Sequence, residues 1–128
     1  MNKNRVDTLI PDAYAILDKV GIVENGQIID KWWSGQISAF GASITQGSLI
    51  ASVSFFRKDD KRIKLMNAIE QLLGIETSLL EHLQGSNKKR IKEEIMSAAV
   101  ALKLSMNLYE RKESSENVKN TESAENEP

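Results

Sequence analysis

The sequence predicts an all-α protein: a single compact bundle of about five helices in residues 1–111, followed by a disordered acidic tail in residues 112–128. Apolar residues recur at steps of three and four along most of the chain, which is the spacing of one helix face. Signals for β-strands are nearly absent. Hydrophobic residues make up 41% and charged residues 27% of the 128 residues, a balance typical of a globular domain with its own core.

The first predicted helix covers residues 6–20. Pro11 lies inside it and should kink or restart it, with Thr8 as a cap, and Gly21 is a natural stop. The apolar face of this helix consists of Val6, Ile10, Ala13, Leu17 and Val20.

A loop is predicted for residues 21–31, with a turn at Asn25-Gly26. A short hairpin that pairs residues 22–23 with 28–29 stays open as an alternative. Two such strands alone would be marginally stable in water.

The second predicted helix covers residues 34–56 and is apolar on more than one side, which favours a buried position. Gly41 and Gly47 inside it each cost about 1 kcal/mol relative to alanine, so we expect close approach of another backbone or a ligand. The absence of charged residues in this segment also leaves a membrane span open. Nine Ser, Thr and Gln side chains in the same segment favour the buried helix.

Three more helices complete the predicted bundle. Asp59 and Asp60 should cap a helix that ends at Leu73. Ser78 and Glu81 have capping-box spacing for a short helix that runs through residue 84. The longest helix should run from residue 86 or 87 to residue 111. Its apolar face consists of Ile91, Ile95, Ala98, Leu102, Met106 and Tyr109.

No pattern in the sequence predicts an enzyme, a metal site or a cofactor. The chain has no cysteine and a single histidine, His82, which makes a poor metal site and a poor catalytic base without partners. The adjacent carboxylates Glu93 and Glu94 point in different directions on a helix, so they do not form a catalytic pair. We therefore expect a protein that works by binding.

Two basic clusters are the candidate binding residues. The first is Arg57, Lys58, Lys61, Arg62 and Lys64, and the second is Lys88, Lys89, Arg90 and Lys92. Such clusters suit phosphate backbones and imply no reading of base sequence, although each could also be a merely solvated helix face. The residues predicted to contact phosphate are Arg57, Lys58, Lys61, Arg62, Lys88, Lys89, Arg90 and Lys92.

Trp32 and Trp33 allow two interpretations. Exposed, the pair could stack on bases or anchor a partner protein. Buried, it would belong to the core, and burial of at least one of the two is favoured because aromatic residues dominate small cores.

Residues 35–56 carry a resemblance to a known family. Gln46-Gly47, then Leu49-Ile50-Ala51 and Phe55-Phe56, form a small-residue helix with a polar residue and a glycine ahead of an apolar, Phe-ending stretch. This pattern resembles the central helix of the Cmr small-subunit family, the small subunit of type III-B CRISPR effector complexes. The resemblance extends over about residues 5–109. Members often have Asn before the helix glycine, where this chain has Gln46.

The resemblance implies a non-catalytic role in a cytoplasmic, antiviral ribonucleoprotein. Copies of the small subunit stack along a filament built on the guide RNA and contact the path of guide RNA and target RNA through basic residues. The implied partners are other effector-complex subunits, copies of the chain itself and these RNAs, with no membrane. The alternative is a helical adaptor or oligomerisation protein with no nucleic-acid role, which would bind a partner through its apolar stripes and the two tryptophans.

Overall fold

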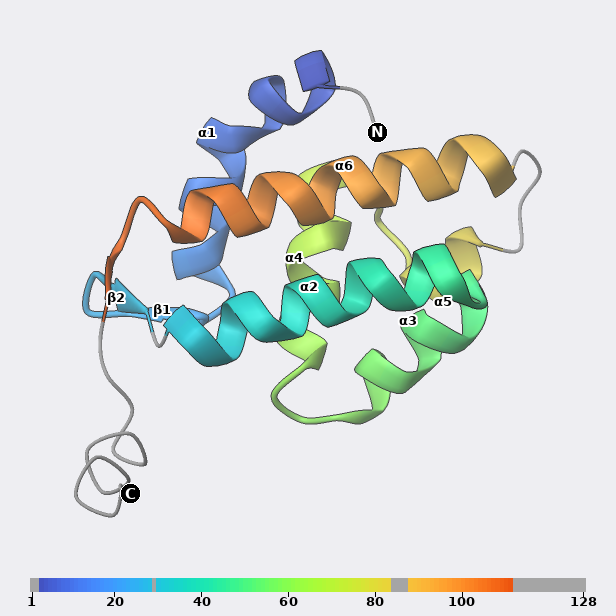
Figure 1. Cartoon of the computed structure of the whole chain (residues 1–128), viewed down its shortest axis with the longest axis horizontal. Helices are drawn as coiled ribbons and strands as arrows, with labels where there is room; N and C mark the ends of the chain where they lie inside the picture. The colour runs from blue at the N-terminus through green and yellow to red at the C-terminus, as the bar shows by residue number, and fades with distance from the viewer. Residues whose placement is uncertain (1–2, 29, 84–87, 112–128) are drawn as a thin grey trace.

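A computed structural model describes residues 3–28, 30–83 and 88–111 and confirms the all-α fold (Figure 1). The predicted disorder of residues 112–128 and the predicted start of the last helix lie outside the described residues. The helices in the described part are α1 (Lys3–Lys19), α2 (Asp30–Gln46), α3 (Leu49–Lys58), α4 (Ile63–Leu73), α5 (Leu79–His82) and α6 (Lys88–Met106).

The helix α6 is the centre of the bundle. It packs against α1, α2 and α4, and Figure 1 shows α2 and α6 side by side and running in opposite directions. The core between these helices is mostly aliphatic, and full burial of each large side chain contributes about 1.5–3 kcal/mol. Its largest fully buried members include Leu17, Phe40, Ile44, Leu65, Met66, Ile69, Ile95, Leu102 and Met106.

Helix α1 continues through Pro11 without a restart. The predicted cap is wrong, because the Thr8 hydroxyl donates to the carbonyl oxygen of Asn4 at 2.8 Å inside the helix. The predicted stop is right: Gly21 follows the helix with φ +87°, a conformation that glycine adopts without strain.

The possible hairpin forms, and it gains a third strand. Strands β1 (Val23–Glu24) and β2 (Gln27–Ile28) pair antiparallel around Asn25 and Gly26, which both have positive φ, as a tight two-residue turn requires. Strand β3 (Glu110–Arg111) pairs parallel with β2. The prediction that the last helix reaches residue 111 is therefore wrong.

Stacking of two tyrosines accompanies the early end of α6. The rings of Tyr14 and Tyr109 are parallel within 4°, with centroids 4.1 Å apart, and the Tyr109 hydroxyl donates to the Tyr14 carbonyl oxygen. These contacts fix the chain just before β3 against α1. They join segments that are far apart in sequence, which helix periodicity does not register.

The single helix predicted for residues 34–56 is wrong. The chain breaks at Gly47 and Ser48, and the Ser48 hydroxyl accepts a hydrogen bond from the Ala51 backbone N–H at 3.2 Å, which caps α3. The described residues therefore contain six helices, and no described helix is long and apolar enough to cross a membrane. On α3, Val53 and Phe56 point inward, whereas Phe55 is 61% exposed.

The expected close approach at Gly41 is not found within the described chain. A Cβ atom at Gly41 would have no described atom within 4 Å, whereas one at Gly47 would lie 3.2 Å from the carbonyl oxygen of Ser43. Gly47 thus belongs to the helix break, and Gly41 leaves open space on α2.

Two of the predicted helix ends are confirmed near α4 and α5. Gly74 ends α4 with φ +70°, and the Ser78 hydroxyl caps α5 by accepting from the Glu81 N–H at 3.2 Å. Asp59 caps the turn before α4 instead of the helix itself. Its Oδ2 accepts from the N–H groups of Lys61 and Arg62, at 3.0 and 2.7 Å, and α4 begins at Ile63.

Candidate nucleic-acid interface

The first basic cluster lies at the junction of α3 and α4, where internal partners hold part of its charge. Nη1 of Arg57 lies 2.7 Å from Oε2 of Glu70 on α4, and the two side chains are only 26% and 14% exposed. The same oxygen accepts from the backbone N–H of Leu79, the first residue of α5, at 2.9 Å. Arg57 therefore connects α3 to α4, and its charge is less available to a phosphate than that of an unpaired arginine.

Arg62 is held by four neighbours. Its Nε donates to Oε1 of Gln36 on α2 at 2.6 Å, and its Nη1 lies 3.2 Å from Oδ1 of Asp59. The centre of its guanidinium lies 5.4 Å from the centroid of the Trp32 ring and 5.7 Å from that of Phe55, distances at which a cation is attracted to a ring face. These contacts fix the guanidinium beside two aromatic rings.

The two tryptophans have different environments. Trp33 is 3% exposed and belongs to the core, which confirms that at least one of the pair is buried. Trp32 is half-buried at the surface, and its ring meets that of Trp33 edge to face at 4.8 Å. Nζ of Lys61 lies 4.1 Å from the Trp32 centroid, so this lysine rests on an aromatic face.

The remaining lysines of the first cluster, Lys58 and Lys64, differ in exposure and in hydrogen bonding. Lys58 at the end of α3 is exposed, whereas Nζ of Lys64 donates to the carbonyl oxygen of Gly21 at 3.3 Å. Lys58 and Lys61 are therefore the members of this cluster with the most accessible charge.

The carboxylate of Asp59 stays ionised at neutral pH. The N–H of Arg62, which donates to it, lowers the pKa of Asp59 from its usual 3.8, against a smaller opposing effect of burial, and the Lys61 N–H and the charge of Arg62 lower it further. Asp59 thus compensates Arg62 at any physiological pH.

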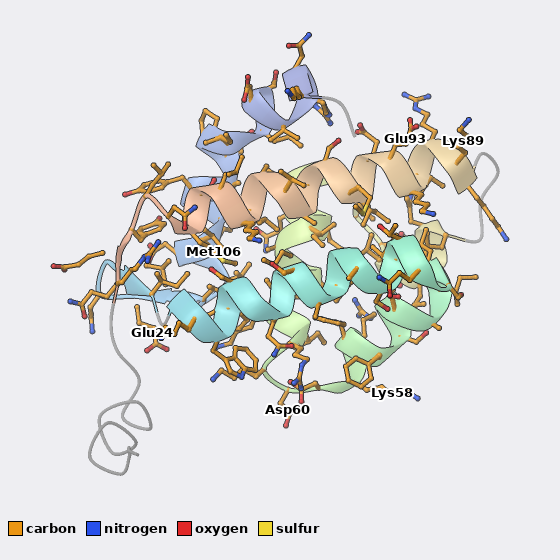
Figure 2. All side chains as sticks on the ribbon, in the orientation of Figure 1. Glu24, Lys58, Asp60, Lys89, Glu93 and Met106 are labelled. Atoms are coloured by element: carbon orange, nitrogen blue, oxygen red, sulfur yellow. The ribbon has the colours of Figure 1, made fainter. Side chains whose placement is uncertain are left out.

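The second basic cluster opens α6 and is exposed throughout. Among the described residues, Lys88, Lys89 and Lys92 have no carboxylate partner. Figure 2 shows Lys89 and Glu93 at the same end of this helix. Cations at a helix N-terminus oppose the macrodipole, so the cluster is unfavourable for α6 and favourable for a bound anion.

Glu94, one turn further along α6, forms an ion pair with Arg5 of α1. Nη2 of Arg5 lies 3.0 Å from Oε1 of Glu94, and its Nε lies 3.3 Å from Oε2. Both side chains are more than a third exposed, so this pair adds little stability and mainly orients α1 against α6.

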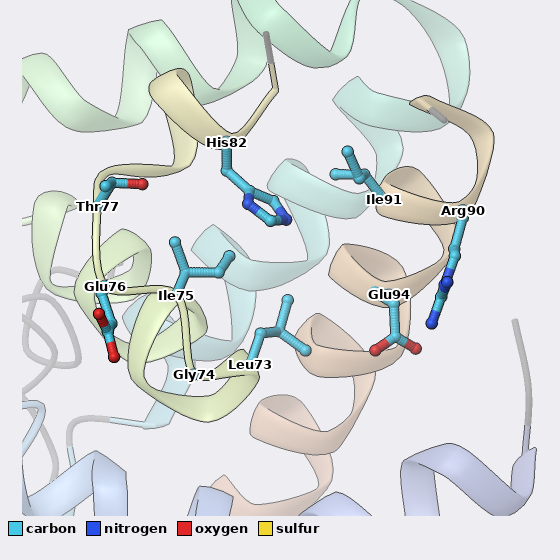
Figure 3. Close-up of a pocket in the computed structure, with 9 residues that line it drawn as sticks. All are labelled: Leu73, Gly74, Ile75, Glu76, Thr77, His82, Arg90, Ile91 and Glu94. Atoms are coloured by element: carbon cyan, nitrogen blue, oxygen red, sulfur yellow. The ribbon is translucent and has the colours of Figure 1, made fainter. Parts of the chain in front are cut away.

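An open groove of about 680 Å³ lies beside the second cluster, between α6 and the segment that joins α4 to α5. Figure 3 shows Leu73, Ile75, His82 and Ile91 pointing toward its middle and Arg90 at its edge. Among the described residues no group of His, Asp and Glu side chains could hold a metal ion. Apolar side chains thus line the middle of the groove, and Glu76, His82 and Glu94 add polar groups to its lining.

The structure does not merge the two clusters into one surface. Figure 2 shows Lys58 beside the turn that follows α3 and Lys89 at the start of α6, with α2 between them in this view. A ligand that contacts both clusters must therefore extend across the molecule, as a nucleic-acid strand can.

Sequence reasoning missed the partners of the first cluster and the exposure of Phe55. Gln36 and Glu70 lie 26 and 13 residues from their arginine partners, beyond the reach of a local pattern. The helix break at Gly47-Ser48 was missed as well. A glycine followed by a serine cap was the signal that could have revealed it.

Comparison with known proteins gives no match: no protein-family profile fits the sequence, and no curated protein or solved structure is significantly similar. The resemblance to the Cmr small-subunit family stays a prediction from residues 35–56. The structure places that pattern on two helices, α2 and α3, instead of one central helix.

Proposed function

We propose that this protein is a non-catalytic structural subunit of a cytoplasmic, guide-RNA-directed antiviral effector complex of the type III-B CRISPR kind. Its partners in this proposal are the guide and target RNA, other effector-complex subunits and further copies of itself. The observation that carries the RNA-binding part is the exposed cluster of Lys88, Lys89, Arg90 and Lys92 at the start of α6. The assignment to this kind of complex rests on the sequence resemblance.

A cluster of this composition suits the task of holding an RNA backbone. Lysines bind phosphate through charge, without reading the bases, and each contact releases a counterion from the strand. In guided complexes base pairing provides the sequence specificity, so a scaffold subunit needs only shape and positive charge. The unfavourable position of the cations on α6 is offset when phosphates bind there.

Charge reversal tests the RNA contact directly. We expect the triple variant Lys88→Glu, Lys89→Glu, Lys92→Glu of the full chain to bind a fluorescently labelled 20-nucleotide RNA more weakly in an anisotropy titration. The dependence of log affinity on log salt should also become shallower, by about 0.7 for each phosphate that the variant no longer neutralises.

Lys103→Glu is the matched control, because Lys103 is an exposed lysine in the last turn of the same helix. Its effect should be small. An equal loss of affinity in the control, or unchanged binding in the triple variant, would contradict an RNA site at the start of α6.

Affinity purification from the native host tests the assembly. Recovery of guide RNA together with larger effector subunits would support the proposal. Recovery of partner proteins without RNA would favour the alternative, a helical adaptor.

A further inference from the structure

An exposed aromatic ring on α3 is not explained by the packing of the bundle. Phe55 is 61% exposed, whereas its neighbour Phe56 is 3% exposed. The Phe55 ring is nevertheless supported, since it meets the Phe56 ring at 5.7 Å and the Arg62 guanidinium at the same distance. A ligand that covers this ring removes apolar surface from water, which favours binding.

Arg62 contacts this ring, and other cations belong to the same part of the structure. Lys58 follows Phe55 by three residues, which places both on one side of α3. Lys61 and Arg62 lie against the half-buried ring of Trp32, and Arg62 also contacts Phe55. Residues 57–64 contain five bases and two acids. Of the acids, Asp59 is engaged by Arg62, and Asp60 is exposed beside the turn (Figure 2).

We infer that Phe55 is a stacking platform for a base of single-stranded RNA, with Lys58 and Lys61 binding the neighbouring phosphates. Every base has a flat face, so stacking on an exposed aromatic ring tolerates any sequence, and cations beside the ring follow the backbone. The inference rests on the proposed RNA-binding function and adds a second contact site, distinct from the cluster on α6.

Arg62 is a positioning residue in this arrangement. Its Nε and Nη1 are engaged by Gln36 and Asp59, so less of its guanidinium is available to a phosphate than the ammonium groups of Lys58 and Lys61. Its guanidinium, in the turn between α3 and α4, instead contacts both the Trp32 ring at the start of α2 and the Phe55 ring on α3, and so fixes the two rings relative to each other.

The positive charge near Phe55 favours RNA as the ligand over an apolar protein surface. Docking of an apolar partner on Phe55 would bring the ammonium groups of Lys58 and Lys61 close to apolar atoms, at a cost in desolvation. A strand of RNA covers the ring with a base and gives both ammonium groups a phosphate partner.

Four substitutions in the full chain test the inference, with a labelled 12-nucleotide single-stranded RNA in anisotropy titrations over a range of salt. Phe55→Ala should lower affinity about fivefold or more, with an unchanged salt slope because no charge is removed. Phe55→Tyr should keep most of the affinity, and Phe55→Leu should lose it, because leucine retains an apolar surface without a ring. Leu108→Ala is the matched control, since Leu108 is 62% exposed and lies in the turn after α6.

The outcomes separate the possibilities. Full affinity in Phe55→Leu would overturn stacking in favour of a general apolar contact. Full affinity in Phe55→Ala, with binding abolished in the α6 triple variant, would overturn this inference and leave the proposed function standing. Absence of RNA binding by the unaltered chain would overturn both. Far-UV circular dichroism of each variant verifies that the helices are intact.

Discussion

Replacement of Glu70 by alanine should destabilise the fold by about 2–4 kcal/mol. The Glu70 carboxylate is 14% exposed and accepts from Arg57 at 2.7 Å and from the Leu79 N–H at 2.9 Å. Loss of the charged hydrogen bond costs about 1.5–3 kcal/mol, and a donor left without an acceptor costs about 1–3 kcal/mol. Arg57 is 26% exposed and regains some hydration in the variant, so the total falls below the sum of the extremes.

Urea unfolding followed by circular dichroism measures this effect. Glu70→Gln should cost less than Glu70→Ala, because the amide oxygen can still accept from Leu79 while the charge is removed. A double-mutant cycle with Arg57→Ala should give a coupling of about 1 kcal/mol or more. A Glu70→Ala variant within about 0.5 kcal/mol of the unaltered protein, or a coupling near zero, would refute the assigned role of this pair.

Alanine substitutions at Arg57 and Lys58 separate structural from RNA-binding roles in the first cluster. Arg57→Ala should lower stability more than RNA affinity, since Arg57 is engaged by Glu70. Lys58→Ala should do the reverse, since Lys58 is exposed. An Arg57→Ala variant that folds normally and loses RNA binding would instead establish Arg57 as a phosphate contact.

Three further predictions concern stability. Gly41→Ala should stabilise the protein by about 0.5–1 kcal/mol, because a Cβ there meets no described atom within 4 Å. Gly74→Ala should instead destabilise it by about 1–2 kcal/mol, because Gly74 has φ +70°. Thermal unfolding of the two variants verifies the opposite signs. Burial, with the nearby Tyr14 and Asp18, raises the pKa of Tyr109 above 10.0. The contribution of the neutral Tyr109 hydroxyl to stability should therefore be full below pH 10 and be lost as pH rises through the raised pKa. Urea titrations of Tyr109→Phe over this pH range should lack that part of the decline. The double variant Lys88→Ala, Lys89→Ala should be more stable than the unaltered protein by a few tenths of a kcal/mol, since it removes cations from the positive end of the α6 dipole. A lower melting temperature of this variant would contradict that reasoning.

The helical fold could be predicted from the sequence because each helix declares itself locally. The stripes of apolar residues at steps of three and four predicted part of the buried faces of α1 and α6. Of their members, Ile10, Val20, Ile91 and Tyr109 are only partly buried. Gly21, Gly74 and Ser78 marked three of the ends, because chain reversal and capping depend on residues within one turn. The break between α2 and α3 was missed, since the apolar pattern runs on through Gly47 and conceals the cap at Ser48.

The two basic clusters were recognisable as groups of residues but not as surfaces. Only the packed structure shows that Glu70 engages Arg57 and that the lysines at the start of α6 lack a described carboxylate partner. A cluster of bases is visible in the sequence because its members are close along the chain. Their ion-pair partners are not, because these pairs form between helices that are distant in sequence.

By itself the sequence determined the class of fold, the three helix ends marked by Gly21, Gly74 and Ser78, and the basic composition of the candidate interface, because these depend on spacing and on residue type. Tertiary structure alone decided that Phe55 faces outward, that Trp32 and Trp33 differ in burial, and that β3 closes a small sheet with β1 and β2. Exposure, charge pairing and strand addition are properties of contacts between distant segments. They exist only once the chain has packed.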